Sequence, residues 1–279
     1  MDRSTTDRPT TDRLFRFAAT ALIPLCLIPL LSNSSISRAS TAPSPTSPPT
    51  AKRMAGLPPL MLWAWERPED LRFLGSNHVG VAYLAATILL GPNGATFRPR
   101  LQPLRVSPDT KLMAVIRIET SPGARLDSTQ AAAIAAQIAR TASLAQVAAV
   151  QIDFDAAESQ HSFYAELLRD LRQRLAPSMP ISITALASWC IGDRWLTGLP
   201  IDEAVPMLFR MGVGEREVSN WLALGRDFRS AECRGSLGIS TDELRPAPLS
   251  AGRRVYAFSP APWSEHSLAT LHSELQSWR

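Results

Sequence analysis

Two pairs of carboxylates could carry acid–base chemistry in this chain of 279 residues. Asp153 and Asp155 stand two residues apart at the end of an apolar run, and Asp242 and Glu243 follow another such run. Glycoside hydrolysis needs two carboxyl groups beside the bond, one to donate a proton and one to act as nucleophile or base. We predict these four residues as the catalytic set, with Asp155 as nucleophile or base and Glu243 or Asp242 as the acid.

A second group of side chains near the ends of the apolar runs could hold a substrate. Indole rings are large amphipathic surfaces that suit the faces of sugar rings, and charged groups bind hydroxyls through strong hydrogen bonds. The predicted substrate-binding residues are Glu66, Trp65, Arg117, Glu119, Trp189 and Arg210. The expected partner is therefore an oligosaccharide or a polysaccharide. The alternative is a structural ion-pair network in which Arg117 pairs with Glu119 or Asp153.

Several other kinds of chemistry lack the residues that they need. No two of the four histidines form a His-x-His or His-x-x-x-His pair, so we expect no metal site. The only lysines are Lys52 and Lys111, neither of which is placed for a Schiff base in a pocket. The glycine-rich nucleotide motifs and the Gly-x-Ser-x-Gly motif do not occur, so no cofactor is expected.

The composition is typical of a folded globular chain. Hydrophobic residues make up 45% and charged residues 19%, which excludes a disordered protein. The net charge is +4 without a dense basic stripe, so we expect no nucleic-acid partner. One apolar run alone approaches the length of a membrane span, which excludes a multi-pass membrane protein.

The first 57 residues are predicted to precede the fold. Residues 1–16 are polar and contain four arginines, residues 17–31 are apolar apart from Thr20, and Ser37-Arg38-Ala39 offers a small-residue cleavage site. This pattern predicts a signal peptide over 1–39, or alternatively an uncleaved membrane anchor. Six prolines among residues 40–59 predict a linker over 40–57. We expect a periplasmic or secreted protein whose membrane contact, if any, is made by residues 17–31.

Strand and helix patterns alternate through the predicted domain, residues 58–279. Four amphipathic patterns predict helices over 128–141, 162–175, 215–228 and 264–278. The predicted strands are Leu60–Trp65, Val79–Leu90, Leu112–Glu119, Ala148–Asp155, Pro180–Trp189, Ala204–Met211, Ser236–Thr241 and Arg254–Phe258. The order predicts parallel strands and an α/β fold, a TIM-like (β/α)8 barrel. An open, doubly wound parallel sheet is the alternative.

The outer ring of helices is expected to be incomplete. Pro92-Asn93-Gly94 is typical of a hairpin turn, and residues 95–106 would return as an extended arm in place of a helix. Within the strands, side chains alternate between two faces, so Gln151, Asp153 and Asp155 share one face. In a barrel that polar face would point inward and line a pocket at the carboxyl ends of the strands.

Cys190 and Cys233 are the two cysteines of the predicted domain. The strand assignments place them at different ends of the barrel, so we expect two buried free thiols. A disulfide is the alternative in an oxidising compartment.

Five segments of the chain carry a family resemblance. They are Leu62-Trp63-Ala64-Trp65-Glu66-Arg67-Pro68-Glu69-Asp70, Gln151-Ile152-Asp153-Phe154-Asp155-Ala156, Ser182-Ile183-Thr184-Ala185-Leu186-Ala187-Ser188-Trp189-Cys190, Val205-Pro206-Met207-Leu208-Phe209-Arg210-Met211-Gly212 and Leu237-Gly238-Ile239-Ser240-Thr241-Asp242-Glu243. Over about residues 58–265 the chain resembles an uncharacterised bacterial family, the domain of unknown function 3142. That resemblance implies no particular activity.

A more distant resemblance is to chitinase-type glycoside-hydrolase barrels, whose fourth strand ends in Asp-x-x-Asp-x-Asp-x-Glu. Asp153 and Asp155 match the last two Asp positions, but Val150 and Ala157 stand at the first Asp and at the proton-donor Glu. Other glycosidase barrels place acids after strands four and seven, which Asp155 with Asp242 or Glu243 resembles. The departure at Ala157 keeps a second hypothesis open, a non-catalytic barrel of the cell envelope that binds carbohydrate or protein.

Overall fold

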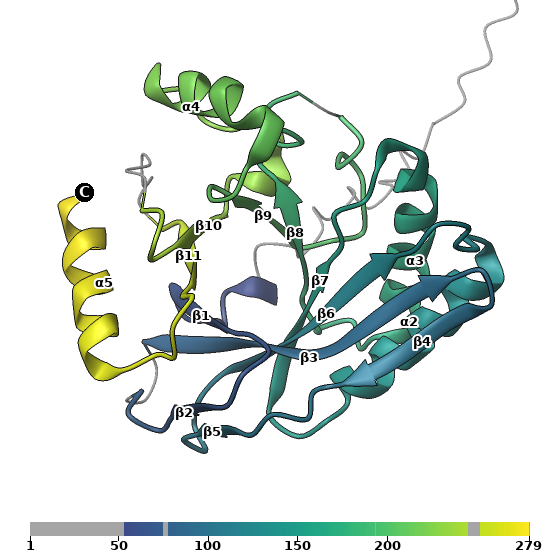
Figure 1. The fold of residues 1–279 in the computed structure, drawn as a ribbon, viewed down its shortest axis with the longest axis horizontal. Coiled ribbons are helices and arrows are strands. Elements are labelled where there is room, and N and C mark those ends of the chain that lie inside the picture. The colour runs from purple at the N-terminus through teal and green to yellow at the C-terminus, as the bar shows by residue number, and fades with distance from the viewer. Residues whose placement is uncertain (1–52, 75–77, 193, 245–251, 279) are drawn as a thin grey trace, which may run out of the picture. The chain divides into compact units, whose positions relative to one another are not determined.

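Eight parallel strands close into a barrel in the computed structural model, and each strand follows one of the apolar runs (Figure 1). In order around the barrel they are β1 (Leu60–Ala64), β3 (Val79–Gly91), β6 (Leu112–Thr120), β7 (Val147–Asp153), β8 (Ile181–Leu186), β9 (Glu203–Met207), β10 (Ser236–Ser240) and β11 (Arg254–Phe258). The barrel closes because β1 pairs with both β11 and β3. The predicted TIM-like barrel is confirmed, and the open sheet is wrong.

The structure describes residues 53–74, 78–192, 194–244 and 252–278, all within one compact unit, Ser47–Arg279. The predicted signal peptide and most of the predicted linker lie outside the described residues. The end of that linker contributes to the barrel, since Met54 and Leu57 are buried beside the inward-facing Met61. In the part of the chain that is described, no helix has both the length and the apolar character to cross a bilayer.

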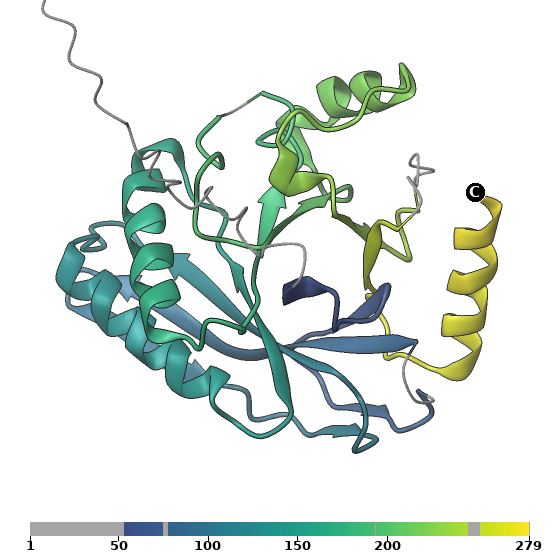
Figure 2. The ribbon, with the colours of Figure 1, turned by 180° about the vertical axis from the view of Figure 1, so that it is seen from behind.

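Four helices among the described residues cover parts of the barrel. They are α2 (Ser128–Ala142), α3 (His161–Arg174), α4 (Glu215–Ala223) and α5 (Glu265–Ser277). The helices α2 and α3 lie side by side over one flank of the barrel, whereas α4 and α5 lie apart from them (Figures 1 and 2). The N-cap of α2 is Asp127, whose Oδ1 accepts a hydrogen bond from the Gln130 N–H at 2.9 Å. That hydrogen bond lowers the pKa of Asp127.

A β-hairpin and short strands replace helices in the first part of the described chain. β3 turns at residues 92–93 into the antiparallel strand β4 (Gly94–Pro99), with Gly91 opposite Gly94. The backbone of Gly94 has a φ of +115°, which only glycine adopts readily. β2 (Glu69–Leu71) pairs with β5 (Leu104–Val106) below them. The predicted hairpin and incomplete helix ring are both confirmed.

Alternation along the strands separates two hydrophobic cores. Outward residues such as Ile152 and Ile183 pack under the helices and form what we call the outer core. Inward residues such as Trp63, Val115 and Tyr256 fill the barrel and form the inner core. The end of the barrel at which the strands begin is closed by polar contacts. There Glu203 accepts hydrogen bonds at 2.7 Å from the Arg254 guanidinium and from the Tyr256 hydroxyl. Because side chains fill the end at which the strands begin, a site in the barrel must lie at the carboxyl ends of the strands.

Cys190 and Cys233 form a disulfide, with their Cα atoms 5.9 Å apart, so the expectation of two free thiols is wrong. Cys190 follows β8, and Cys233 lies in η3 (Ala231–Cys233) before β10. The strand assignments separated them because they ignored the path of the connections. The chain before η3 folds against Cys190, whose carbonyl oxygen accepts hydrogen bonds from the N–H groups of Arg229 and Ser230 at 2.9 and 3.2 Å.

Candidate active site

A cavity of about 340 Å³ opens at the carboxyl ends of the barrel strands. We call this end of the barrel, around the cavity, the barrel mouth. The polar side chains in the cavity wall are Arg117, Asp153, Asp155, Thr184, Ser188 and Arg210. Its aromatic side chains are Trp63, Trp65, Phe209 and Phe258. The carboxyl ends of parallel strands are where barrel enzymes carry their active sites, so this cavity is the candidate site.

Asp153 is the last residue of β7 and points into the cavity. The hydroxyl of Thr184, on the neighbouring strand β8, donates a hydrogen bond to Asp153 Oδ1 at 2.7 Å. Burial nevertheless raises the pKa of Asp153 to about 6, and the nearby charge of Asp155 adds to the increase. A carboxyl group with this pKa is partly protonated near neutral pH, as a general acid must be.

Asp155 lies two residues further along, on the same side of the chain as Asp153, and also lines the cavity. Burial raises its pKa as well, while the positive charge of Arg117 acts in the opposite direction. The intervening Phe154 is buried in the outer core, where it contacts Tyr164 of α3 edge-on at 5.1 Å between ring centroids. Packing of Phe154 thus aims both carboxyl groups at the barrel mouth.

Arg117 pairs with Glu119 rather than with Asp153. Its Nε lies 2.8 Å from a Glu119 carboxylate oxygen, and its guanidinium lies 6.0 Å from the Trp65 ring centroid. A network that sealed the barrel would have joined Arg117 to Asp153, which stands next to it across the strands. The observed pairing leaves the cavity open, with Arg117 in its wall.

Arg210 follows β9 and is held in place by the residues after β10. Its backbone N–H donates a hydrogen bond to Glu243 Oε2 at 3.0 Å, and its Nη2 lies 3.5 Å from Asp242 Oδ2. The φ of Arg210 is +50°, an uncommon conformation for a residue with a side chain. Its guanidinium lies 5.1 Å from the ring centroid of Phe258.

Asp242 and Glu243 are not among the residues that line the cavity. The Ser240 hydroxyl donates a hydrogen bond to Asp242, which, together with the Arg210 charge, lowers the pKa of Asp242. A carboxylate with a lowered pKa is a poor proton donor near neutral pH. The structure therefore places this predicted pair behind Arg210 as its supports.

Glu66 and Trp189 also lie away from the cavity wall. The side chain of Glu66 is exposed beyond β1. Trp189 is buried in the outer core, where it meets Trp195 edge-on at 4.9 Å between ring centroids and His161 at 5.7 Å. Of the predicted binding residues, the cavity thus brings together Trp65, Arg117 and Arg210, with Glu119 next to Arg117.

Several residues of the cavity wall were not among the predicted catalytic and substrate-binding residues. Thr184, Phe209 and Phe258 belong to it, and each has the inward parity of its own strand. Applying the alternation along the whole predicted strand Ala204–Met211 would have found Phe209, two residues past the end of β9, since Val205 and Met207 precede it on the same face. Among the described residues, no three His, Cys, Asp or Glu side chains gather in a way that could hold a metal ion.

Residues 109–205 match the model of a family described as "Domain of unknown function (DUF3142)". The matched segment contains β6, β7 and β8, and with them Arg117, Asp153, Asp155 and Thr184. Comparisons with curated proteins and with solved structures found no match for the chain.

Proposed function

We propose that the cavity of this barrel binds carbohydrate and that Asp153 donates a proton to a glycosidic oxygen there. The observation that carries the proposal is that Asp153 and Asp155 together line a cavity with aromatic walls, where burial raises the pKa of Asp153 to about 6. Burial-raised carboxyl groups act as general acids in glycoside hydrolysis at near-neutral pH. The family match itself implies no activity, so the proposal depends on the site.

The two carboxyl groups take different roles because their surroundings differ. Asp153 is the more deeply placed and has the neighbouring carboxylate of Asp155 to raise its pKa further. Asp155 has Arg117 to favour its charged form, which suits a nucleophile or a base. This assignment moves the acid from Asp242 or Glu243 to Asp153, because only the latter lines the cavity.

The remaining wall suits a sugar. Trp65 and Phe258 offer flat apolar surfaces, and each has an arginine, Arg117 or Arg210, within 6.0 Å of its ring centroid. Sugar rings present apolar faces and hydroxyl edges, which aromatic rings and guanidinium groups complement respectively. The cavity volume of about 340 Å³ falls within the size range of small-ligand sites.

We further propose that the protein works in the periplasm or outside the cell. The Cys190–Cys233 disulfide supports this location, since structural disulfides persist mainly in oxidising compartments. The predicted signal segment points the same way.

The test is to assay the full-length protein against a panel of bacterial and plant glycans for released sugar ends. We expect Asp153→Asn and Asp155→Asn to lower kcat at least about 100-fold on any glycan that the wild type cleaves. Asp109→Asn is the matched control, because Asp109 is exposed before β6, at the opposite end of the barrel. If both site variants cleave the glycan as the wild type does, the proposal fails.

A second candidate is carbohydrate binding without hydrolysis. The observation in its favour is Ala157, which stands where the chitinase-type barrels that this strand resembles have their acid. Glycan binding by the wild type with no product, and equal binding by Asp153→Asn, would select this candidate over the enzyme.

A further inference from the structure

The β3–β4 hairpin extends the inner surface of the barrel beyond the barrel itself. In the strand register, Thr87 of β3 stands between Arg98 of β4 and Arg117 of β6. One step further out, Leu89 stands between Thr96 of β4 and Glu119. Residues that stand opposite one another across strands share a face. Because Arg117 faces the cavity, Thr87, Leu89, Thr96, Arg98 and Glu119 lie on the same face of the sheet as the cavity.

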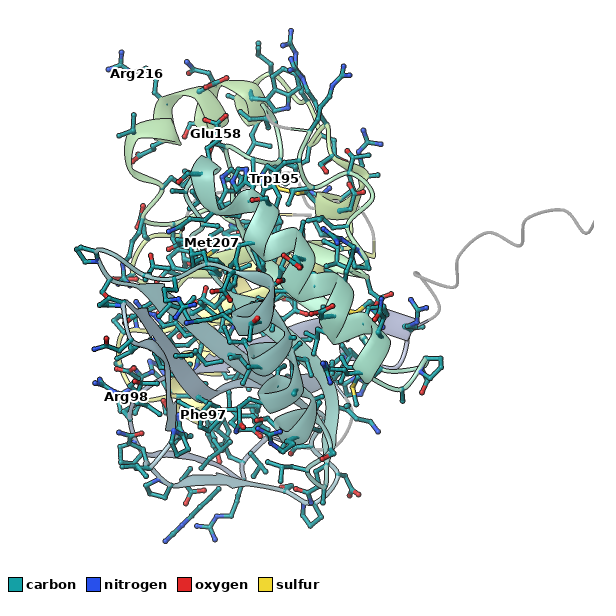
Figure 3. The ribbon with its side chains drawn as sticks, turned by 90° about the vertical axis from the view of Figure 1, so that its right-hand side faces the viewer. Phe97, Arg98, Glu158, Trp195, Met207 and Arg216 are labelled. Carbon is teal, nitrogen blue, oxygen red and sulfur yellow. A yellow bond between two sulfur atoms is a disulfide. The ribbon has the colours of Figure 1, made fainter. Side chains whose placement is uncertain are left out.

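This extended face is open to solvent, whereas its reverse is covered. Thr96 and Arg98 are exposed, and Thr87 and Leu89 are partly exposed. Phe97, between the two exposed residues, points the other way and packs against the outer core (Figure 3). We call the open face, made of Thr87, Leu89, Thr96, Arg98 and Glu119, the hairpin platform.

A second hollow, of about 400 Å³, lies at the outer end of the hairpin platform. Its lining includes Asn93, Thr96, Glu119 and Thr120, so hydroxyl, amide and carboxylate groups surround it. The first cavity ends at Arg117 and the second hollow begins at Glu119. The ion pair between these two residues, at 2.8 Å, is therefore the boundary that both spaces share.

We propose that the hairpin platform is a second glycan subsite, and that the substrate is an oligosaccharide or polymer spanning both spaces. This inference rests on the proposed function of the first cavity. A single sugar needs that cavity alone, whereas a chain that leaves it toward β6 meets the Arg117–Glu119 pair and then the platform. The hydroxyl and charged groups of the platform match the hydroxyl-rich edge of a glycan. The described chain between β3 and β6 forms no helix, so this connection leaves the platform open to solvent.

The experiment measures the affinity of the full-length protein for oligosaccharide ladders, from disaccharide to hexasaccharide, by titration calorimetry. The probes are cello-, xylo-, chito- and galacturono-oligosaccharides. We expect the wild type to bind a tetrasaccharide about tenfold more tightly than the disaccharide of the same ladder, from a few added hydrogen bonds. In Thr96→Trp, which places a large indole ring in the second hollow and obstructs it, that ratio should fall to about one.

Two further variants sharpen the result. Thr96→Val removes the hydroxyl at nearly constant volume, and the ratio should fall several-fold. Ser273→Trp places the same large ring on the exposed side of α5, far from the hairpin in Figure 1, and should keep the wild-type ratio. A ladder that binds with no dependence on length, or with the same dependence in Thr96→Trp, overturns this inference alone. Failure of every ladder to bind overturns the proposed function and this inference with it.

Discussion

The burial of Asp153 lowers the stability of the folded protein when the carboxyl group is charged, but it also gives this group the raised pKa of a general acid. Its carboxyl group keeps one hydrogen bond, from Thr184, yet burial raises its pKa to about 6. In the unfolded chain the same group titrates near 3.9. Between these two values the folded state holds the proton more tightly, so the stability contributed by this group is present at low pH and is lost as the pH rises through 6.

We expect Asp153→Asn to stabilise the protein at pH 8 by about 2 kcal/mol, because the amide removes a poorly solvated charge while leaving a hydrogen-bond acceptor for Thr184. Near pH 4 the wild-type group is protonated in the folded state, so the difference in the free energy of unfolding should nearly disappear. Urea titrations of both proteins at pH 4 and pH 8 measure it. A variant less stable than the wild type at pH 8 would contradict the burial argument.

The contacts of Arg210 could not be predicted from residue types and their spacing. Asp242 and Glu243 were predicted as catalytic residues because they follow a strand. Their oxygens, however, accept hydrogen bonds from Arg210, which stands in an uncommon backbone conformation. Arg210 is 32 residues from Asp242 and 33 residues from Glu243 in the chain, so neither residue type nor local spacing indicates these contacts.

The strands were the most predictable elements. All eight predicted strands are present, and β11 spans the predicted residues Arg254–Phe258. Strand residues alternate with a period of two, and the covering helices make one face of each strand apolar. Helix ends were less predictable. α4 ends at Ala223 rather than at the predicted Phe228, and Gly225 with φ +70° lies just beyond.

One glycine within a strand has a clear packing reason. Gly238 of β10 faces the interior, and a Cβ there would lie 2.8 Å from Cη2 of Trp63. Trp63 reaches across the barrel and donates a hydrogen bond from Nε1 to Gln151 Oε1 at 2.8 Å. The ring therefore has no freedom to move aside without losing a buried hydrogen bond.

We expect Gly238→Ala to lower the free energy of unfolding by about 1–3 kcal/mol, as overpacked cores do. Near-ultraviolet circular dichroism and chemical denaturation report the change, since Trp63 must shift. The control is Gly235→Ala, at a position just before β10 where a Cβ would meet no atom within 4 Å. Equal stability of the two variants would show that the ring yields at little cost.

At the scale of the whole molecule, two links join segments that are distant in the chain. The pairing of β1 with β11 joins the two ends of the described fold. The Cys190–Cys233 disulfide ties the connection after β8 to the segment before β10, across a sequence separation of 43.

Cys233→Ser should lower the free energy of unfolding by about 4 kcal/mol, because a closed loop of this length restricts the unfolded chain. Urea denaturation under oxidising conditions measures the loss. The double variant Cys190→Ser/Cys233→Ser should lose about as much as the single one, since both remove the same bond. Unchanged stability of Cys233→Ser would mean that the disulfide adds nothing to the fold.

By itself the sequence determined the number and the approximate places of the eight barrel strands, the hairpin at residues 92–94, and which residues of these strands share a face. These features follow from periodicity and turn chemistry, which act over a few residues. The inward direction of Arg117, Asp153 and Asp155 was accessible in this way, because alternation places them opposite a continuous apolar face. The sequence did not indicate β2, the short strand over Glu69–Leu71.

The tertiary structure alone decided which of the polar residues meet. In the closed barrel, Phe258 and Arg210 line the same cavity as Asp153, Trp189 packs in the outer core, and Cys190 is joined to Cys233. Each of these outcomes depends on contacts between segments distant in the chain, and their geometry follows from the closed ring of strands and the paths of the connections. No pattern over a few residues indicates that geometry, because the interactions that determine it form only when all eight strands of the barrel have paired.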